Sequence, residues 1–525
     1  MMRKNWIAMS LTVVFLISLV LSGCTDNKPA TGADNSATKK GGTLKVAING
    51  EPPTLDMNKN TSVVVQEISY HIFEGLFTFD DKYNAIPMLA KDYSYDAANK
   101  KYTINLRAGV KFHNGKILTA DDVVASINRW GKVSTYGKTF LRYAQEVKKT
   151  GDLTIEILLK DPSPIIPMLL AVPAHGAGIF PEESIVAAGD GDIKEFIGTG
   201  PFRFVEHKAD QYIKLARFDD YSALDGPAIG MGGKRAALVD ELMFIPTPEN
   251  SVRLDGVQTG QFDYAIQVNS DSYAQVKANT QVDSVIIKPY WWATAIFNKK
   301  MGAFKDQKLR QAFALALNMD PIMKAAFTNE EFYRLDPSIL FKEQTEWWSD
   351  SGKEMYNQGN IEKAKQLMKE ANYNGEKIRW MTTKDYDFMY KNAVVAVEQL
   401  KQIGFNIELQ VSDWATIAQR RAKPEEWEVF SNGVSFIADP GIWAVWESSW
   451  PGWWESQKKD EMINKVNTEM DPKARKKKMD DLQAVFWEEL PVSKFGDFFV
   501  LDVKSKKVNG FVPSAYHYFW NVSKN

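Results

Sequence analysis

Cys24 is the only cysteine in the 525 residues, and its thiol is the side chain whose position most clearly indicates chemistry. A short basic head and a mostly apolar run over residues 7–21 precede it, and the run ends in the small residues of "LSGC" (21–24). A charged head followed by about 7–15 apolar residues is the layout of a secretory signal, whereas a membrane-spanning helix needs roughly 20 apolar residues. The sequence therefore predicts a signal peptide over residues 1–23, with a stop-transfer helix as the alternative.

The stretch "LSGC" resembles the bacterial lipobox, in which cleavage leaves the cysteine as a new N-terminus that carries lipid. A nucleophilic thiolate suits this role, and the alternative is a buried core cysteine. Residues 24–42 contain no large apolar side chain and are predicted to be a disordered tether. The resemblance implies a protein outside the cytoplasm, anchored to the cell membrane through lipidated Cys24, in the periplasmic space if the organism has two membranes. A single thiol also excludes an intramolecular disulfide.

The rest of the chain contains no complete catalytic or cofactor-binding motif of the kinds considered below. The stretch "GPAIGMGGKR" (226–235) departs from a phosphate-binding loop, because Ala228 stands at the first glycine position and Arg235 at the serine or threonine position. There is no G-x-S-x-G or H-E-x-x-H pattern, and the five histidines lack the spacing of metal ligands. The net charge of -2 gives no basic surplus for nucleic acid. We therefore expect no enzyme, no cofactor, no metal site and no nucleic-acid partner.

Strand and helix patterns alternate along the chain. Thr119 and Asp122 form a capping box before an apolar helical stripe, Asn360 is a candidate N-cap, and a predicted helix over 389–403 ends at Gly404. Apolar side chains recur at every second residue, as in half-buried strands, over 43–48, 102–107, 153–159 and 405–411. This alternation predicts the α/β class.

A series of stretches spread over residues 43–520 resembles the family 5 extracellular solute-binding proteins of ABC importers, which include oligopeptide-, dipeptide- and nickel-binding proteins. No single stretch is decisive, but their order over the whole body is specific. They are "EPPTLD" (51–56), "HIFEGLFTFD" (71–80), "PMLAKDYSYDAANKKYTINLRAGVKFHNGKILTADDVVAS" (87–126), "IGTGPFRFVEH" (197–207), "FDDY" (218–221), "VRLDGVQTGQFDYA" (252–265), "FNKKMGAFKDQKLRQAFALALNMD" (297–320) and "EKAKQLMKEANYNGE" (362–376).

The resemblance implies a two-lobed α/β fold like that of the periplasmic binding proteins, of type II (cluster C), with an extra inserted domain. Two crossing strands, "IIKPYWWATAIF" (286–297) and "PVSKFGDFFVL" (491–501), would form a hinge between the lobes. The implied parts are lobe I at residues 43–83, 196–285 and 495–525, inserted domain II at 84–195, and lobe III at 286–494.

The resemblance also implies where a ligand binds. Peptide binders of the family hold the peptide backbone through main-chain hydrogen bonds, and they pair its ammonium with an aspartate in an aromatic-x-small-Asp stretch of lobe III. The stretch "FIAD" (436–439) matches, so that Phe436, Ala438 and Asp439 are candidate ligand contacts. The alternative is that Asp439 only caps the turn at Pro440. On lobe I, Thr61, Ser62 and Val63 match the segment that offers backbone partners.

Further candidates for the cleft wall lie near the crossing strands and in the stretch "DWATIAQRR" (413–421). Dipeptide binders carry an arginine where this chain has Tyr390, so that longer peptides, or another amine-bearing solute, fit better than dipeptides. For Trp414 and the two arginines, packing within lobe III is the alternative. The remaining candidates are Tyr290, Trp291, Trp292, Tyr386, Tyr390, Trp414, Arg420 and Arg421.

The function implied by the resemblance is that of a monomeric, lipid-anchored receptor, which captures peptides and delivers them to an ABC permease and its ATPase. We expect it to be open without ligand and closed with it. The alternatives are a binding protein for another amine-bearing solute or a nickel chelate, a receptor that serves sensing rather than transport, and a surface hydrolase. The sequence supplies no nucleophile–base pair for the hydrolase.

Overall fold

The computed structural model describes residues 40–60, 62–173 and 176–525. The predicted signal peptide, Cys24, most of the predicted tether and Thr61 lie outside the described residues. Among the helices that the structure describes, none combines the length and the apolar character that a membrane crossing requires.

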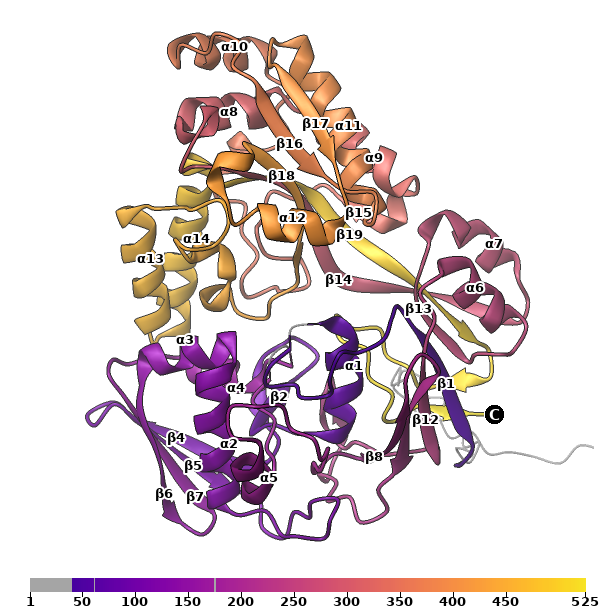
Figure 1. The fold of residues 1–525 in the computed structure, drawn as a ribbon. Coiled ribbons are helices and arrows are strands. Elements are labelled where there is room, and N and C mark those ends of the chain that lie inside the picture. Colours follow the sequence, from indigo (N-terminus) through magenta and orange to yellow (C-terminus); the bar gives the residue numbers. More distant parts are fainter. Residues whose placement is uncertain (1–39, 61, 174–175) are drawn as a thin grey trace, which may run out of the picture. The chain divides into compact units, whose positions relative to one another are not determined.

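A long mixed sheet joins the parts that the sequence assigns to lobes I and III (Figure 1). The short strand β15 (Tyr333–Arg334) pairs with β19 (Val492–Ser505) beside this path. The spatial order is β17 (Ile407–Val411), β16 (Ile378–Thr382), β18 (Val429–Ser435), β14 (Val282–Phe297), β19 (Val492–Ser505), β13 (Tyr264–Val268), β1 (Thr43–Ile48), β12 (Glu241–Pro246), β9 (Tyr212–Arg217) and β8 (Phe202–Lys208).

The two long strands β14 and β19 lie at the centre of this sheet and contain the two crossing segments predicted from the sequence, apart from Pro491. They pair antiparallel from Val282 opposite Ser505 to Ile296 opposite Val492, and their register shifts between Ile287 and Trp291. In Figure 1 they pass between an upper group of elements, from α8 (Gln307–Ala316) to α11 (Asp387–Gln402), and a lower group around α1 (Val63–Ile72), α2 (Ala120–Val133) and β12. Two adjacent crossing strands allow one group to rotate against the other.

The segment predicted as inserted domain II contains a separate antiparallel sheet of four strands. The capping box predicted at Thr119 and Asp122 is present at the start of helix α2. The strands, in spatial order, are β4 (Ala90–Asp96), β5 (Lys101–Leu106), β7 (Thr154–Leu159) and β6 (Ala144–Gly151), and the helices are α2 (Ala120–Val133), α3 (Thr135–Tyr143), α4 (Ile165–Ala171) and α5 (Glu182–Ala188).

Lobe III packs helices around β16, β17 and β18, and α11 connects β16 to β17 as the crossover of a parallel pair. Asn360 caps α10 by accepting a hydrogen bond from the Lys363 N–H, as predicted. The helices are α8 (Gln307–Ala316), α9 (Met319–Phe327), α10 (Ile361–Glu370), α11 (Asp387–Gln402), α12 (Trp414–Arg420), α13 (Gln457–Thr468) and α14 (Pro472–Glu489).

Lobe I carries helix α1 (Val63–Ile72), whose residues from Val65 to Ile72 are all buried. The C-terminal segment returns to this helix, because the Phe519 N–H donates to the His71 ring and Tyr70 donates its hydroxyl hydrogen to the His517 carbonyl. The remaining elements are α6 (Asn250–Gln258), α7 (Tyr273–Ala278), and the antiparallel pairs β2 (Phe77–Phe79) with β3 (Ala85–Pro87), β10 (Ala228–Ile229) with β11 (Gly232–Gly233), and β20 (Val508–Asn509) with β21 (Ser523–Lys524). Of these, β3 lies just inside the segment predicted as domain II.

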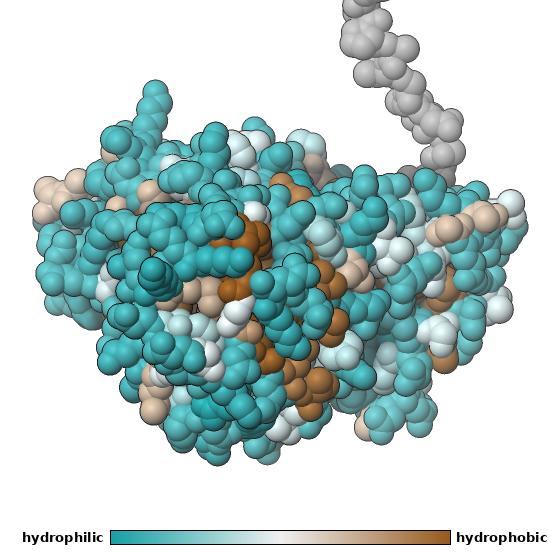
Figure 2. Space-filling view, turned by 90° about the horizontal axis from the view of Figure 1, so that it is seen from above, coloured by the Kyte–Doolittle hydropathy of each residue, from teal (hydrophilic) through white to brown (hydrophobic). Residues whose placement is uncertain are grey.

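The face of the molecule in Figure 2 is mostly hydrophilic, in keeping with a charged share of 25%. Many of the sixteen tryptophans are buried, including Trp130, Trp380 and Trp487. The domain boundaries stay a prediction.

Candidate functional site

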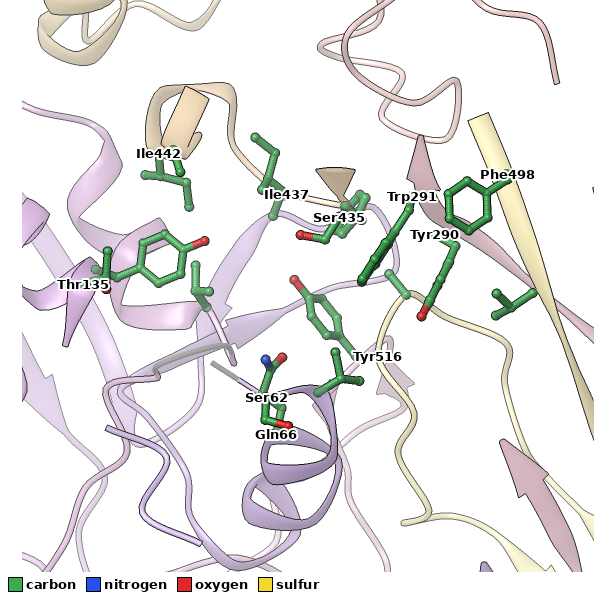
Figure 3. A pocket seen from close by; sticks show the side chains of 18 of the residues that line it. Ser62, Gln66, Thr135, Tyr290, Trp291, Ser435, Ile437, Ile442, Phe498 and Tyr516 are labelled. Atoms are coloured by element: carbon green, nitrogen blue, oxygen red, sulfur yellow. The ribbon is translucent and has the colours of Figure 1, made fainter. Parts of the chain in front are cut away.

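A cavity of about 1610 Å³ lies between lobe III, lobe I and the predicted domain II. In Figure 3, Ile437 and Ile442 of lobe III face Gln66 of α1 and Tyr516 of the C-terminal segment. Tyr290, Trp291 and Phe498 gather on one side of the view, and Thr135 of α3 lies on the other side. The crossing strands therefore supply one end of the cavity, and α3 of the predicted domain II supplies the other.

Aromatic rings form the wall at the crossing strands. Tyr290 and Trp291 stack with ring centroids 5.3 Å apart and an interplanar angle of 6°, and Phe498 of β19 stands edge-on to both. Tyr386 and Trp414 extend this wall as an edge-to-face pair at 5.5 Å. Of the aromatic candidates named from the sequence, five line the cavity: Tyr290, Trp291, Tyr386, Trp414 and Phe436. Flat rings offer contact area with few rotamers to order.

The "FIAD" stretch divides between the cavity and the interior. Phe436 and Ala438 line the cavity, and the Phe436 N–H donates to the Tyr290 carbonyl at 2.8 Å. Asp439 does not line it: the residue is 2% exposed, and its two carboxylate oxygens each accept a hydrogen bond of 2.7 Å from the Arg475 guanidinium. One of them also accepts from the Gly441 N–H, so that Asp439 caps the turn. Both oxygens of the Asp439 carboxylate are therefore already bonded within the protein in this structure, whereas the predicted role was to pair with a ligand ammonium.

Four other candidates lie away from the cavity lining. Trp292 is 1% exposed and packs against Trp443. Arg420 forms an ion pair with Glu426 at 2.7 Å. Arg421 lies over the Trp414 ring, and Tyr390 lies beneath the Lys384 ammonium. For these residues the structure favours packing and pairing within lobe III.

Helix α1 brings a polar face to the opposite wall. Ser62 and Val63, predicted as contacts, line the cavity at the start of α1, and Gln66, Glu67 and Tyr70 continue the lining along the helix. The spacing of three, four and seven residues from Val63 places them on one helix face. Glu67 is not among the residues predicted from the sequence, although its position as an acid between the apolar residues of "VVVQEISYHI" was a signal that could have identified it.

Glu67 belongs to a buried charged cluster with His517 and Asp502. The His517 Nδ1 lies 2.9 Å from Glu67 Oε1, and its Nε2 lies 2.8 Å from Asp502 Oδ2. Burial by itself would lower the pKa of His517, but the charges and hydrogen bonds of Asp502 and Glu67 raise it to about 10. His517 is therefore an imidazolium at neutral pH.

The other charges of the cavity wall are mostly paired with each other or with neighbours. Three acids have a basic partner at 2.5 Å: Glu447 pairs with Arg142, Asp387 with Lys391, and Asp460 with Lys459. The exposed Asp385 accepts a hydrogen bond from the Trp414 N–H. The Arg142–Glu447 pair joins α3 to lobe III across the cavity.

Two further contacts join the predicted domain II to lobe III. The Asn467 side chain donates to the Tyr143 hydroxyl at 3.0 Å, and the Ser163 hydroxyl donates to the Asn467 carbonyl at 2.8 Å. The predicted domain II thus touches lobe III at the end of the cavity remote from β14 and β19. In the described part of the chain, no group of three or more histidine, cysteine and acidic side chains is arranged to hold a metal ion.

Comparison with known proteins identifies relatives along most of the chain. The family model of bacterial extracellular solute-binding proteins, family 5 Middle, matches residues 84–454. The probable peptide ABC transporter periplasmic-binding protein y4tO of Sinorhizobium fredii is 26% identical over 495 residues, which cover 88% of this chain and 90% of the relative. The oligopeptide-binding protein AppA of Bacillus subtilis is 26% identical over 526 residues, which cover 94% of this chain and 93% of the relative.

Solved structures confirm the predicted fold class. The structure of AppA from Bacillus subtilis in complex with a nonapeptide matches with a TM-score of 0.77 at 22% identity, and covers 93% of this chain and 100% of that one. The substrate-binding protein CtaP from Listeria monocytogenes matches with a TM-score of 0.79 at 23% identity over the same shares.

Proposed function

The chain belongs to the bacterial extracellular solute-binding proteins of family 5, and we propose that it captures peptides between its lobes and delivers them to the permease of an ABC transporter. In this role it binds and releases its solute without a catalytic step. Two relatives of similar length, y4tO and AppA, are named for peptide transport and oligopeptide binding. Their names support peptides as the solute class.

The single observation that carries the proposal is the cavity. Its volume of about 1610 Å³ exceeds the roughly 300–1,000 Å³ that is usual for small-molecule sites. Its wall combines aromatic rings, which tolerate many side chains, with polar side chains from lobe I. A solute that is longer than a single amino acid and variable in side chain suits such a wall.

Binding would shift the protein between open and closed arrangements. The closing contacts would be Arg142 with Glu447 and Asn467 with Tyr143 and Ser163. The hinge would be the pair β14 and β19. A solute that contacts both lobes binds the closed arrangement more tightly and shifts the population toward it.

We further propose that the mature protein begins at Cys24 and is held at the outer face of the cell membrane by lipid. The support is the lone thiol behind the apolar run and the requirement that a receptor for a permease stay near the membrane. In a Cys24→Ala variant, we expect the protein to lose the lipid mass and to leave the membrane fraction. Lipid-bearing Cys24→Ala protein would contradict this proposal.

Native mass spectrometry of the protein purified without refolding tests the solute class, because a closed cleft retains its ligand. We expect peptide masses in the bound fraction, and calorimetric binding of an added nonapeptide after the ligand has been removed. The same peptide should be recovered uncut after long incubation. An amine-bearing compound that is not a peptide in the bound fraction, together with no heat on addition of peptide, would contradict the proposal.

A further inference from the structure

Lobe I presents a buried excess of negative charge to the cavity. Glu67 of α1 and Asp502 of β19 are two carboxylates that share a single cation, the imidazolium of His517. The three side chains are between 0% and 3% exposed. Within the described part of the chain, no other basic side chain forms an ion pair with either acid. Buried charges are normally neutralised by a partner, and this cluster lacks one cation.

We propose that Glu67 is the anchor for a cationic group of the bound solute, so that the cavity selects peptides whose ammonium group is free at the end held by lobe I. This inference rests on the proposed function and names the group of the solute that the site recognises. The missing cation of the cluster is then supplied by the ligand, and it is expelled with the ligand when the lobes open.

The hydrogen bonds within the cluster direct the excess charge to Glu67. Asp502 lies behind the cavity wall, and its oxygens accept from the Tyr264 hydroxyl at 2.7 Å and the Gln267 N–H at 2.8 Å, in addition to His517. Glu67 has His517 as its only ion-pair partner among the described residues, and it lines the cavity. Of the two acids, Glu67 is therefore the one that a solute can reach.

A second acceptor on the same wall also lacks a donor. Asn49 lines the cavity, and its Oδ1 is buried with no hydrogen-bond partner among the described residues. Its amide nitrogen donates to Gln267, which donates in turn to Asp502 and to the Tyr290 hydroxyl, so that Asn49 is connected to the charged cluster. An ammonium group carries three donors and no acceptor, which matches a wall that presents unsatisfied oxygens.

One more cation lies close enough to interact with Asp502. Burial lowers the pKa of Arg253, and the charge of Asp502 partly opposes this shift. The guanidinium, however, donates to main-chain carbonyls, those of Thr247, Pro248, Ile266 and Gln267. It therefore holds the end of β13 in place and does not pair with either acid of the cluster.

The other acids around the cavity are less suitable anchors. Asp439 is neutralised by Arg475 and faces the interior. Glu447, Asp387 and Asp460 have their own basic partners. Asp385 is exposed, and at an exposed site water and salt weaken a charge interaction.

The test compares a nonapeptide with its N-acetylated form on the wild type and on Glu67→Gln, by calorimetry of ligand-stripped protein. We expect acetylation to weaken binding to the wild type by more than about tenfold, because one partner of a buried charge pair is removed. Glu67→Gln should weaken binding of the free peptide to a similar extent, and should discriminate little between the two peptides. The losses should therefore not add in the double cycle.

Two controls separate the anchor role from general damage to lobe I. Glu74→Gln changes a buried acid just beyond α1, which binds Arg235, Thr199 and Tyr221 and does not line the cavity, and it should keep the full preference for the free ammonium. Asp385→Asn changes the exposed acid at the cavity and should also keep that preference. Glu67→Asp retains the charge and should retain part of the preference, which also covers the case in which Glu67→Gln folds poorly.

The possible failures are distinguishable. If the wild type binds neither peptide, the proposed function fails and the inference fails with it. If the wild type binds both peptides equally, peptide capture stands and the ammonium anchor is wrong. If acetylation weakens binding and Glu67→Gln retains that preference while Asp385→Asn loses it, the ammonium is read by Asp385 and the assignment to Glu67 is wrong.

Discussion

Two buried acids beside the same cavity, Asp439 in lobe III and Glu67 in lobe I, differ in how their charge is neutralised. Both carboxylate oxygens of Asp439 lie 2.7 Å from the guanidinium of Arg475, which gives a complete bidentate pair. Glu67 shares one imidazolium with a second acid. The first arrangement is balanced without a ligand, and the second is not. A match to a motif therefore does not by itself show that an acid is available to a ligand, because the charges around the acid also have to leave it unpaired.

The two walls also differ in what they offer a solute. The lobe III wall presents aromatic rings such as Trp291 and Trp414, and its charges are paired within the protein or exposed to water. The lobe I wall carries the buried excess negative charge of Glu67 and Asp502. Lobe III would therefore accommodate variable side chains, whereas lobe I would fix the position of the charged end.

The largest expected effect concerns the balanced pair. Arg475→Met leaves the Asp439 carboxylate buried without its partner, and we expect the free energy of unfolding to fall by about 3–5 kcal/mol. Adding Asp439→Asn to Arg475→Met removes the unpaired charge and should restore part of this loss. Denaturant unfolding of the single and double variants checks both results, and a double variant no more stable than Arg475→Met would contradict the account of a closed pair.

The next effect concerns the unbalanced cluster and is a dependence on pH. His517 is protonated in the fold with a pKa of about 10, above its ordinary value of 6.5. Its contribution to stability is therefore complete below about pH 6.5 and is lost as the pH rises toward about 10. We expect the free energy of unfolding to fall by a few kcal/mol over this window, and the fall to be absent in His517→Gln.

The groups packed around His517 allow this window to be assigned. Burial holds the pKa of Tyr70 and Tyr264 well above the ordinary value, so that the unfolded tyrosines ionise first, near pH 10, at the top of the window. Burial lowers the pKa of His71 from 6.5 to about 3. The protonation of this side chain in the unfolded chain therefore lowers the free energy of unfolding only below about pH 6.5, outside the window of His517. Glu67→Gln removes one of the two acids and should move the loss to lower pH, which calorimetric melting across the pH range would measure. An unchanged profile would show that Glu67 does not act on the imidazolium.

A smaller effect distinguishes the two acids directly by affinity. Because Asp439 faces the interior, Asp439→Asn should change the affinity for a nonapeptide by less than about threefold, a difference under 1 kcal/mol. Calorimetric titration of Asp439→Asn and Glu67→Gln with the same nonapeptide compares the two affinities directly. If Asp439→Asn loses more than about tenfold while its fold is intact, Asp439 contacts the ligand and the two walls exchange their roles.

Local patterns explain which parts could be predicted from the sequence. The strand at 43–48 has the predicted bounds, and the capping box at Thr119 is present, because alternation and capping depend on residues a few positions apart. The fold class followed from many such stretches in family order. The helix predicted over 389–403 begins slightly earlier, at Asp387.

Sequence patterns could not identify the charged cluster at the cavity, because its members come from distant segments. Glu67, Asp502 and His517 meet only after β19 has returned to lobe I and the C-terminal segment has packed on α1. Arg475, which neutralises Asp439, lies 36 residues further along the chain on α14. The basic stretch there, "ARKKK" (474–478), is typical of a solvated helix face. No spacing rule links these positions, so the sequence could identify the acid in "FIAD" but not the partner that occupies it.

The smallest expected effect concerns the contacts that join the lobes at the far end of the cavity. The Arg142–Glu447 pair is 54% and 40% exposed, and such pairs contribute about 0–1 kcal/mol. Arg142→Ala should therefore raise the open population of the ligand-free protein only slightly, and the difference should vanish at high salt because ions screen exposed charges. Small-angle scattering of both proteins measures this, with Lys149→Ala as a control, because Lys149 forms its ion pairs with Asp121 and Asp152 inside the predicted domain II. If closure were driven mainly by this surface pair, Arg142→Ala would weaken peptide binding as much as Glu67→Gln does. Neutralisation of the buried charge of lobe I by the ligand would then not be the main source of the energy of closure.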